Sequence, residues 1–143
     1  MVEFACNVCG ARNRVEQFVS EPATCACGSN VRMRALIHLL CLELFGQSIP
    51  AVDFPRLKGV RGVGLSDQEC YARILAEKFD YTNTWYDREP RLDIRHPAQA
   101  WIGACDFVLA ADVIEHIAPP METALAAVRS LLKPNGFFGV TVY

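Results

Sequence analysis

Residues 104–143 read ACDFVLAADVIEHIAPPMETALAAVRSLLKPNGFFGVTVY and decide the predicted fold. Residues 106–110 are typical of a short apolar strand that is buried on both faces of a parallel sheet. A helix is predicted to start at Pro120, because proline suits a first turn, and to stop at the Pro-Asn-Gly sequence over 134–136. Residues 137–143 predict a second apolar strand. A strand, a helix and a strand in this order predict a crossover between parallel strands, and hence the α/β class.

The residues before this stretch continue the alternation of strands and helices. Ser29 or Asn30 can cap a helix over 31–45, which Gly46 terminates. The further predicted elements are a strand over 60–65, a helix over 67–79 with Ser66 and Glu69 as a capping box, a strand over 81–86, a short extended piece over 91–94 and a helical turn over 97–101. We therefore expect a parallel sheet with helices on both faces. Three segments are predicted: a knuckle over 1–30, a helix and linker over 31–58, and a partial α/β domain over 59–143.

Four of the seven cysteines form two short pairs near the N-terminus. Cys6-x-x-Cys9 and Cys25-x-Cys27 are each followed by a glycine, which permits a tight turn in which backbone amides face the sulfurs. Four thiolates from two such turns are a ligand set for structural Zn²⁺, so we predict a zinc-ribbon-like knuckle with a hairpin over the spacer 10–24. The second pair is one residue shorter than the usual spacing, and unmetallated thiols are the alternative.

Composition excludes several classes of partner. The 143 residues include 14 basic and 16 acidic side chains, and a net charge of -2 gives no electrostatic argument for nucleic acid or an anionic membrane. No apolar run reaches the roughly 18 residues that suggest a membrane helix. The first residues lack the basic region and apolar core of a signal peptide. We therefore expect a cytoplasmic protein with a small-molecule substrate.

The strand over 106–110, the Glu115-His116 pair and the LLKPNG sequence over 131–136 together resemble the C-terminal half of class I S-adenosylmethionine-dependent methyltransferases. The chain as a whole resembles a bacterial subgroup of that family with an N-terminal cysteine knuckle, an R-x-R-x-L helix and centres like GVGLSD, here 62–67, and EPRLDI, here 89–94. This resemblance implies a Rossmann-like fold, S-adenosylmethionine as cofactor, and methyl transfer to a small-molecule or sugar-like acceptor.

Two placements of GVGLSD in the family pattern compete. It is either the glycine-rich first loop, which would bring Gly62, Gly64 and Ser66 to the cofactor, or the second strand, which in the family ends in an acid that holds the cofactor ribose. We favour the second, because the elements that follow match the family in order. Gly64 then stands where the acid is expected, and the first loop is missing. Both departures predict weak cofactor binding.

The resemblance implies further contacts at the carboxyl ends of later strands. Asp93 is expected to accept a hydrogen bond from the adenine amine, the backbone at Ala111 to face the methionine part, and Asp112 to lie near the ribose or methionine end. His116 is the candidate catalytic base, since histidine is the side chain whose ordinary pKa lies near neutral. The alternatives are strand-end or capping duty for the two aspartates and a structural hydrogen bond for His116.

Two other functions remain open at this point. A non-catalytic zinc-containing binding module on a degenerate methyltransferase fold agrees with the missing first loop. A nucleic-acid-binding ribbon is less favoured, because Arg12, Arg14, Arg32 and Arg34 lie in a chain that is not basic overall. Members of the family continue past the strand over 137–143, so the chain is expected to be truncated. That strand would then be an exposed edge through which a homodimer could form.

Overall fold

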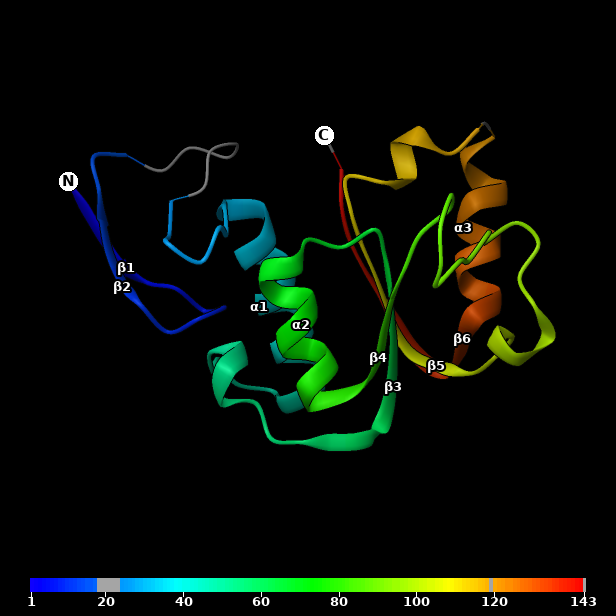
Figure 1. Ribbon diagram of the computed structural model, residues 1–143, viewed down its shortest axis with the longest axis horizontal. Helices are drawn as coiled ribbons and strands as arrows, with labels where there is room; N and C mark the ends of the chain where they lie inside the picture. The colour runs from blue at the N-terminus through cyan, green and yellow to red at the C-terminus, as the bar shows by residue number, and fades with distance from the viewer. Residues whose placement is uncertain (18–23, 119, 143) are drawn as a thin grey trace.

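A computed structural model describes residues 1–17, 24–118 and 120–142. Its main sheet has four parallel strands in the order β4-β3-β5-β6. Helices α1 and α2 cover one face and α3 covers the other (Figure 1), which confirms the predicted α/β fold with helices on both faces. The bounds are Leu57–Leu65 for β3, Phe79–Thr84 for β4, Cys105–Ala111 for β5, Leu132–Thr141 for β6, Val31–Phe45 for α1, Glu69–Lys78 for α2 and Met121–Leu131 for α3.

The strand order corrects the preferred placement of GVGLSD. Strand β3 pairs with β4 on one side and with β5 on the other, since Gly62 is in register with both Tyr81 and Phe107. In the doubly wound order 3-2-1-4-5-6 only the first strand lies between the second and the fourth. GVGLSD is therefore the first strand and its loop, and the interpretation as second strand was wrong. Pairing between distant segments decided this, and no local sequence pattern reports it.

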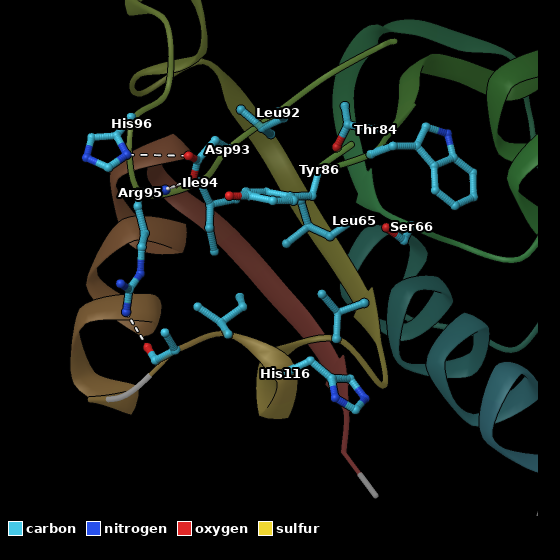
Figure 2. A pocket seen from close by; sticks show the side chains of 14 residues that line it. Leu65, Ser66, Thr84, Tyr86, Leu92, Asp93, Ile94, Arg95, His96 and His116 are labelled. Atoms are coloured by element: carbon cyan, nitrogen blue, oxygen red, sulfur yellow. Dashed lines mark hydrogen bonds and ion pairs between the residues drawn. The ribbon is translucent and has the colours of Figure 1, made fainter. Parts of the chain in front are cut away.

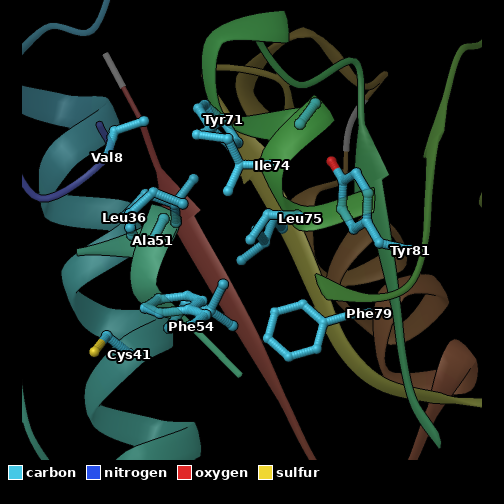
Figure 3. Close-up of a cluster of buried hydrophobic side chains, with 14 of the residues drawn as sticks. Val8, Leu36, Cys41, Ala51, Phe54, Tyr71, Ile74, Leu75, Phe79 and Tyr81 are labelled. Carbon is cyan, nitrogen blue, oxygen red and sulfur yellow. The ribbon is translucent and has the colours of Figure 1, made fainter. Parts of the chain in front are cut away.

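One hydrophobic core extends from the cysteine segment to the sheet. Val8 packs there with Leu36 of α1 and Leu75 of α2 above the sheet (Figure 3). Aromatic rings continue it to the sheet, where Phe79 and Phe107 meet edge to face with centroids 5.6 Å apart. The three segments predicted from sequence thus share one core on this face. A second core under α3 consists mainly of apolar side chains from β3, β5 and α3: Val63, Leu65, Val108, Val128 and Leu131.

Helix α1 follows its prediction closely. Asn30 Oδ1 accepts a hydrogen bond from Met33 N, and Gly46 ends the helix with a left-handed φ of 67°. Helix α2 differs, because it begins at Glu69 and no side chain caps it. The predicted capping box is therefore absent: Ser66 has a φ of 58° and its amide donates to Thr84 O, so the chain is still turning away from the sheet at that point.

The end of α3 also differs from prediction. Strand β6 begins at Leu132, so the residues 134–136 lie inside a strand rather than ending a helix. They form a bulge, because the register with β5 moves from Cys105–Leu132 to Phe107–Phe137. A Cβ on Gly136 would lie 2.9 Å from Cys105 O, so glycine is needed where the bulge passes the neighbouring strand.

Smaller corrections concern the N-terminal hairpin and the connecting segments. The hairpin joins β1 (Val2–Ala5) to β2 (Arg12–Val15) around the first cysteine pair, whereas residues 18–23 of the spacer lie outside the described residues. The predicted linker holds a short 3-10 helix (Ala51–Asp53). The extended piece over 91–94 reduces to one bridge between Trp85 and Arg91, and the predicted turn before β5 is the 3-10 helix Gln99–Trp101. Among the helices of the described residues, none combines the length and the apolar character that a membrane span requires.

Candidate ligand pocket and cysteine cluster

A pocket of about 620 Å³ opens at the carboxyl edge of the sheet. The chain passes from β3 to β4 on one side and returns to β5 on the other, and open α/β sheets bind ligands at such a switch point. The volume lies within the roughly 300–1,000 Å³ typical of small-molecule sites. The lining comes from the ends of β3 and β4, the segment after β5, and the loop before the 3-10 helix η2 (Gln99–Trp101): Leu65, Ser66, Thr84, Trp85, Tyr86, Leu92, Asp93, Ile94, Arg95, His96, Val113, His116, Ile117 and Ala118.

Three of the predicted site residues meet in this pocket. Ser66 follows β3, Asp93 lies on the loop that follows β4, and His116 lies on the turn η3 (Ile114–His116) after β5. Figure 2 shows Asp93 and His116 on opposite sides of the pocket. Ala111 ends β5 and Asp112 follows it, and neither residue lines the pocket. The fold thus brings together side chains that lie up to 50 positions apart in the sequence.

The two predicted glycines lie within β3 rather than at the pocket. A Cβ on Gly62 would meet the ring of Phe107 at 2.1 Å, and a Cβ on Gly64 would meet Tyr81 Oη at 2.1 Å and Asp67 Oδ2 at 2.2 Å. Both positions therefore need glycine for packing inside the sheet. Their contact with a cofactor stays a prediction.

Behind Ser66, the buried carboxylate of Asp67 holds the loop after β3. Its two oxygens accept hydrogen bonds from Tyr71 Oη at 2.8 Å and from Tyr81 Oη at 2.5 Å. The Asn83 side chain bonds to both the amide and the carbonyl of Asp67. Burial raises the pKa of the Asp67 carboxyl to about 7, although the two tyrosine hydroxyls act in the opposite direction. The loop that presents Ser66 is therefore fixed by a polar network.

Asp93 both lines the pocket and organises its own turn. Its Oδ1 accepts a hydrogen bond from Arg95 N at 3.1 Å, and its Oδ2 lies 3.4 Å from His96 Nδ1. The Arg95 guanidinium reaches across and donates to Ala118 O, on the opposite wall (Figure 2). The side chain of Asp93 is 25% exposed, so one carboxylate can cap the turn and still face a ligand.

Asp112 begins the wall that carries His116. Its backbone is left-handed, with a φ of 56°, and its Oδ1 accepts a hydrogen bond from Arg32 Nη1 at 2.9 Å. Arg32 belongs to α1, so this ion pair joins the first helix to the edge of the sheet. Ser66 and Asp112, which directly follow the two strands that flank the switch point, share this left-handed conformation. Left-handed backbone at non-glycine residues is uncommon and clusters at functional sites.

The four N-terminal cysteines form a compact cluster. All four sulfurs lie within 4.8 Å of one another, with 3.8 Å between Cys6 Sγ and Cys27 Sγ and 3.5 Å between Cys9 Sγ and Cys25 Sγ. Sulfurs about 2.3 Å from a tetrahedral zinc ion are separated by about 3.8 Å. The sulfurs of the shorter Cys25-x-Cys27 pair therefore lie close enough to those of the first pair for the cluster to hold a metal ion.

The surroundings of the cluster favour a thiolate at Cys6, whereas burial raises the pKa of the Cys9 thiol to about 12. Burial raises the pKa of the Cys6 thiol, but the Ser29 hydroxyl and the backbone amides of Val8 and Cys9 outweigh it and lower the pKa to about 7. Ser29 is fully buried. Its oxygens accept hydrogen bonds from Arg34 Nη1, at 2.9 Å to the carbonyl and 3.1 Å to the hydroxyl. Arg34, named above among the arginines of a nucleic-acid-binding ribbon, is thus a buried support of the cluster and not a surface charge.

Sequence reasoning missed the aromatic side of the pocket. Trp85 and Tyr86 were placed inside a strand over 81–86, but β4 ends at Thr84 and the two rings belong to the pocket. Arginines cover them, with the guanidinium of Arg88 3.7 Å from the Trp85 ring and that of Arg91 5.7 Å from the Tyr86 ring. An aromatic pair at the carboxyl end of a strand was the signal that could have identified them.

Comparison with known proteins supports the fold. Neither a protein-family model nor a curated protein matches this sequence. One similar solved structure is the CMeT domain of the citrinin polyketide synthase, with a TM-score of 0.56, 14% identity, and coverage of 81% of this chain and 35% of that chain. Another is the DszA carbon methyltransferase, with a TM-score of 0.51, 17% identity, and coverage of 77% of this chain and 36% of that chain.

These comparisons confirm the class of fold expected from sequence. The chain has a class I methyltransferase-like α/β fold, and it spans about a third of the length of the two matched chains. At these identities the likeness concerns the fold. One fold hosts many functions, so the pocket and the cysteine cluster carry the functional evidence.

Proposed function

We propose that this chain is an S-adenosylmethionine-dependent methyltransferase that acts on a small-molecule or sugar-like acceptor. One observation carries the proposal: Ser66, Asp93 and His116 converge from three loops on one pocket at the switch point of a methyltransferase-like sheet. Chance would not favour such convergence on the edge where this kind of sheet binds its ligands.

The pocket suits a nucleoside. Apolar side chains such as Leu92, Ile94 and Val113 offer a surface for a base, and the Asp93 carboxylate can accept from an exocyclic amine. Trp85 and Tyr86 add aromatic surface on the side of β4. A few polar groups on a largely apolar wall are what a small-molecule site needs to orient its ligand.

Each residue has a defined task in this proposal. S-adenosylmethionine, when bound, supplies a methyl group on a positively charged sulfur. Asp93 accepts from the adenine amine, and Ser66 and Asp112 with the backbone at Ala111 border the ribose and methionine parts. His116, exposed at the mouth of the pocket, accepts the proton that an acceptor hydroxyl loses. Catalysis then rests mainly on positioning the acceptor.

Calorimetric titration with S-adenosylmethionine and S-adenosylhomocysteine tests the proposal. We expect saturable binding that Asp93→Ala weakens. We still expect the affinity to be modest, although the strand order removes one reason for it, because GVGLSD does occupy the first-loop position. Absence of binding at millimolar concentrations of both compounds would sink the methyltransferase assignment.

A specific observation keeps the second candidate, a non-catalytic zinc-containing binding module. In the family pattern the second strand ends in an acid that holds the ribose, but β4 ends in Thr84, whose hydroxyl donates to Gly64 O. Asp93 is the one acidic side chain among the pocket-lining residues that the structure describes. A degenerate pocket of this kind would bind a ligand without methyl transfer, so binding in the absence of turnover would favour the module.

The cysteine cluster would serve either function. We propose that it holds one structural Zn²⁺, because four thiolates leave no open position for a substrate. A reducing compartment such as the cytoplasm would keep these thiols available as ligands.

We further propose self-association through the outer edge of β6, where Val140 and Val142 are exposed, and analytical ultracentrifugation of the wild type against Val140→Lys tests it.

A further inference from the structure

The wall of the pocket after β5 is held at both of its ends by arginines from other elements. This wall is the segment 112–118, which carries His116 and three more lining residues. At its start, Arg32 Nη1 donates to Asp112 Oδ1, and at its end Arg95 Nη2 donates to Ala118 O. Between these points the backbone turns on local bonds, from His116 N to Val113 O and from Ile117 N to Ile114 O. The two clamps and the buried side chain of Ile114 together hold the segment in place.

The clamp at Asp112 is partly shielded from water. The side chain of Arg32 is 18% exposed and that of Asp112 is 39% exposed, so the pair is less screened than a surface ion pair. Asp112 also donates its amide to Thr141 O, and Thr141 Oγ1 lies 3.4 Å from its carboxylate. The left-handed backbone of Asp112 is thus fixed by groups from both α1 and β6.

The place of Arg32 is in turn set by the cysteine cluster. Ser29 Oγ lies 3.3 Å from Cys6 Sγ and 3.2 Å from Cys27 Sγ. Arg34 grips the carbonyl and the hydroxyl of Ser29, and its other nitrogen donates to Thr24 Oγ1 at 2.6 Å. The first turn of α1, which carries Arg32, is therefore attached directly to the residues that surround the four thiolates.

We propose that Arg32 is a positioning residue of the pocket and that the metal bound by the cysteine cluster sets its place. Metal binding and ligand binding are then coupled, although the cluster lies outside the pocket lining. The expected effect on ligand binding rests on the proposed function, whereas the coupling between the metal and the segment 112–118 does not. The ion pair between Arg32 and Asp112 transmits this coupling. Arg32 belongs to the helix beside the cysteine cluster, and Asp112 begins the segment 112–118.

Hydrogen exchange tests the coupling without any ligand. In zinc-loaded protein, Arg32→Gln should speed exchange at the amides of Asp112, His116 and Ile117 while the zinc content stays unchanged. Arg73→Gln, at an exposed position on α2, is the matched control and should leave these amides as in the wild type. Unchanged exchange in Arg32→Gln would overturn the proposal.

Binding of S-adenosylhomocysteine then tests the consequence for the pocket. We expect Arg32→Gln to weaken the affinity about threefold to tenfold. Removing zinc with a chelator should weaken it in the wild type but add little in Arg32→Gln, because both changes act through one contact. Additive losses would show that the metal does not act through Arg32. If the wild type binds no S-adenosylhomocysteine, the proposed function fails, and the exchange experiment alone decides the positioning role.

Discussion

Asp67 shows how a single buried side chain can make the stability of this protein depend on pH. Asp67 is 2% exposed, and burial raises the pKa of its carboxyl to about 7. The pKa of an aspartate in the unfolded chain is about 4. The folded state therefore holds a proton over this range that the unfolded state has lost. The resulting stabilisation is complete below about pH 4 and is lost as the pH rises through about 7.

The prediction at this residue concerns the slope of stability with pH. Between about pH 4.5 and about pH 8, the free energy of unfolding of the wild type should fall relative to that of Asp67→Asn, which has no proton to lose. Urea denaturation at several pH values measures this difference. Asp80→Asn, at an exposed aspartate of β4, should follow the wild type. Parallel curves for the wild type and Asp67→Asn would show that burial does not shift the carboxyl.

Two substitutions at Asp93 separate its ligand role from its role in the turn. Asp93→Asn keeps an oxygen that can accept from Arg95 N but removes the charge offered to an adenine amine. Asp93→Ala removes both. The loss of a hydrogen bond to a charged group costs roughly 1.5–3 kcal/mol, so Asp93→Ala should weaken S-adenosylhomocysteine binding about ten- to a hundredfold. Calorimetry and thermal melting on both variants measure the two effects separately.

The adenine role would be contradicted if the melting temperature of Asp93→Ala fell while its affinity held. A smaller loss of affinity in Asp93→Asn, with its melting temperature near that of the wild type, would support the role.

At the scale of single elements, β3 depends on glycine because of its neighbour. A Cβ on Gly62 would lie 2.1 Å from the ring of Phe107, and that ring is fully buried and cannot move aside. Gly62→Ala should therefore lower the free energy of unfolding by about 1–3 kcal/mol. Gly59→Ala is the matched control, since nothing lies within 4 Å of its Cβ position in the same strand. Urea denaturation of both variants measures the difference.

A rescue variant checks the cause of the loss. The double variant Gly62→Ala/Phe107→Leu replaces the ring with a smaller side chain and so removes the clash. Its loss of unfolding free energy should therefore be less than the sum of the losses in the two single variants. Strict additivity would mean that the glycine is needed for another reason.

Local patterns predicted the elements well, and distant contacts decided the rest. The helix predicted over 31–45 has the same bounds as α1, because its cap Asn30 and its terminator Gly46 lie next to it in the sequence. The capping box at Ser66 was wrong, because the bond from its amide to Thr84 O belongs to a neighbouring strand. The turn over 134–136 became a bulge for the same reason: its backbone pairs with β5. The place of GVGLSD in the sheet was also decided by strand pairing.

The candidate site was predicted to the extent that it follows strand ends. Ser66 and His116 come after predicted strands, and Asp93 lies near the end of the predicted extended piece over 91–94. The structure places all three around one pocket. From the sequence, Arg32 was considered as one of four N-terminal arginines of a nucleic-acid-binding ribbon. Its pairing with Asp112 spans 80 positions, and only the packing of α1 on the sheet could reveal it.

At the scale of the whole molecule, the cysteine cluster and the sheet share a hydrophobic core. Cys6 and Val8 are fully buried in the same cluster of side chains as Phe107. Cys9→Ser should therefore lose the metal and also lower the melting temperature of the whole chain, rather than melting the knuckle alone. Metal analysis and calorimetric melting measure the two outcomes.

Cys70→Ser is the control for this prediction. Cys70 lies near the cluster, where its thiol contacts Met33 Sδ at 3.7 Å, but it is not one of the four clustered residues. It should keep a full complement of metal. A folded, metal-free wild-type protein with an unchanged melting temperature would contradict the structural zinc.

The two left-handed residues at the switch point have a consequence for protein engineering. A non-glycine residue in this conformation costs roughly 1–2 kcal/mol that glycine avoids, and Ser66 and Asp112 both adopt it. A library screened only for heat resistance should therefore enrich Ser66→Gly, which relieves the backbone and removes the hydroxyl from the pocket. Asp112→Gly should be enriched less, since it also breaks the pair with Arg32. A screen for ligand capture on the same library should reverse the preference at position 66.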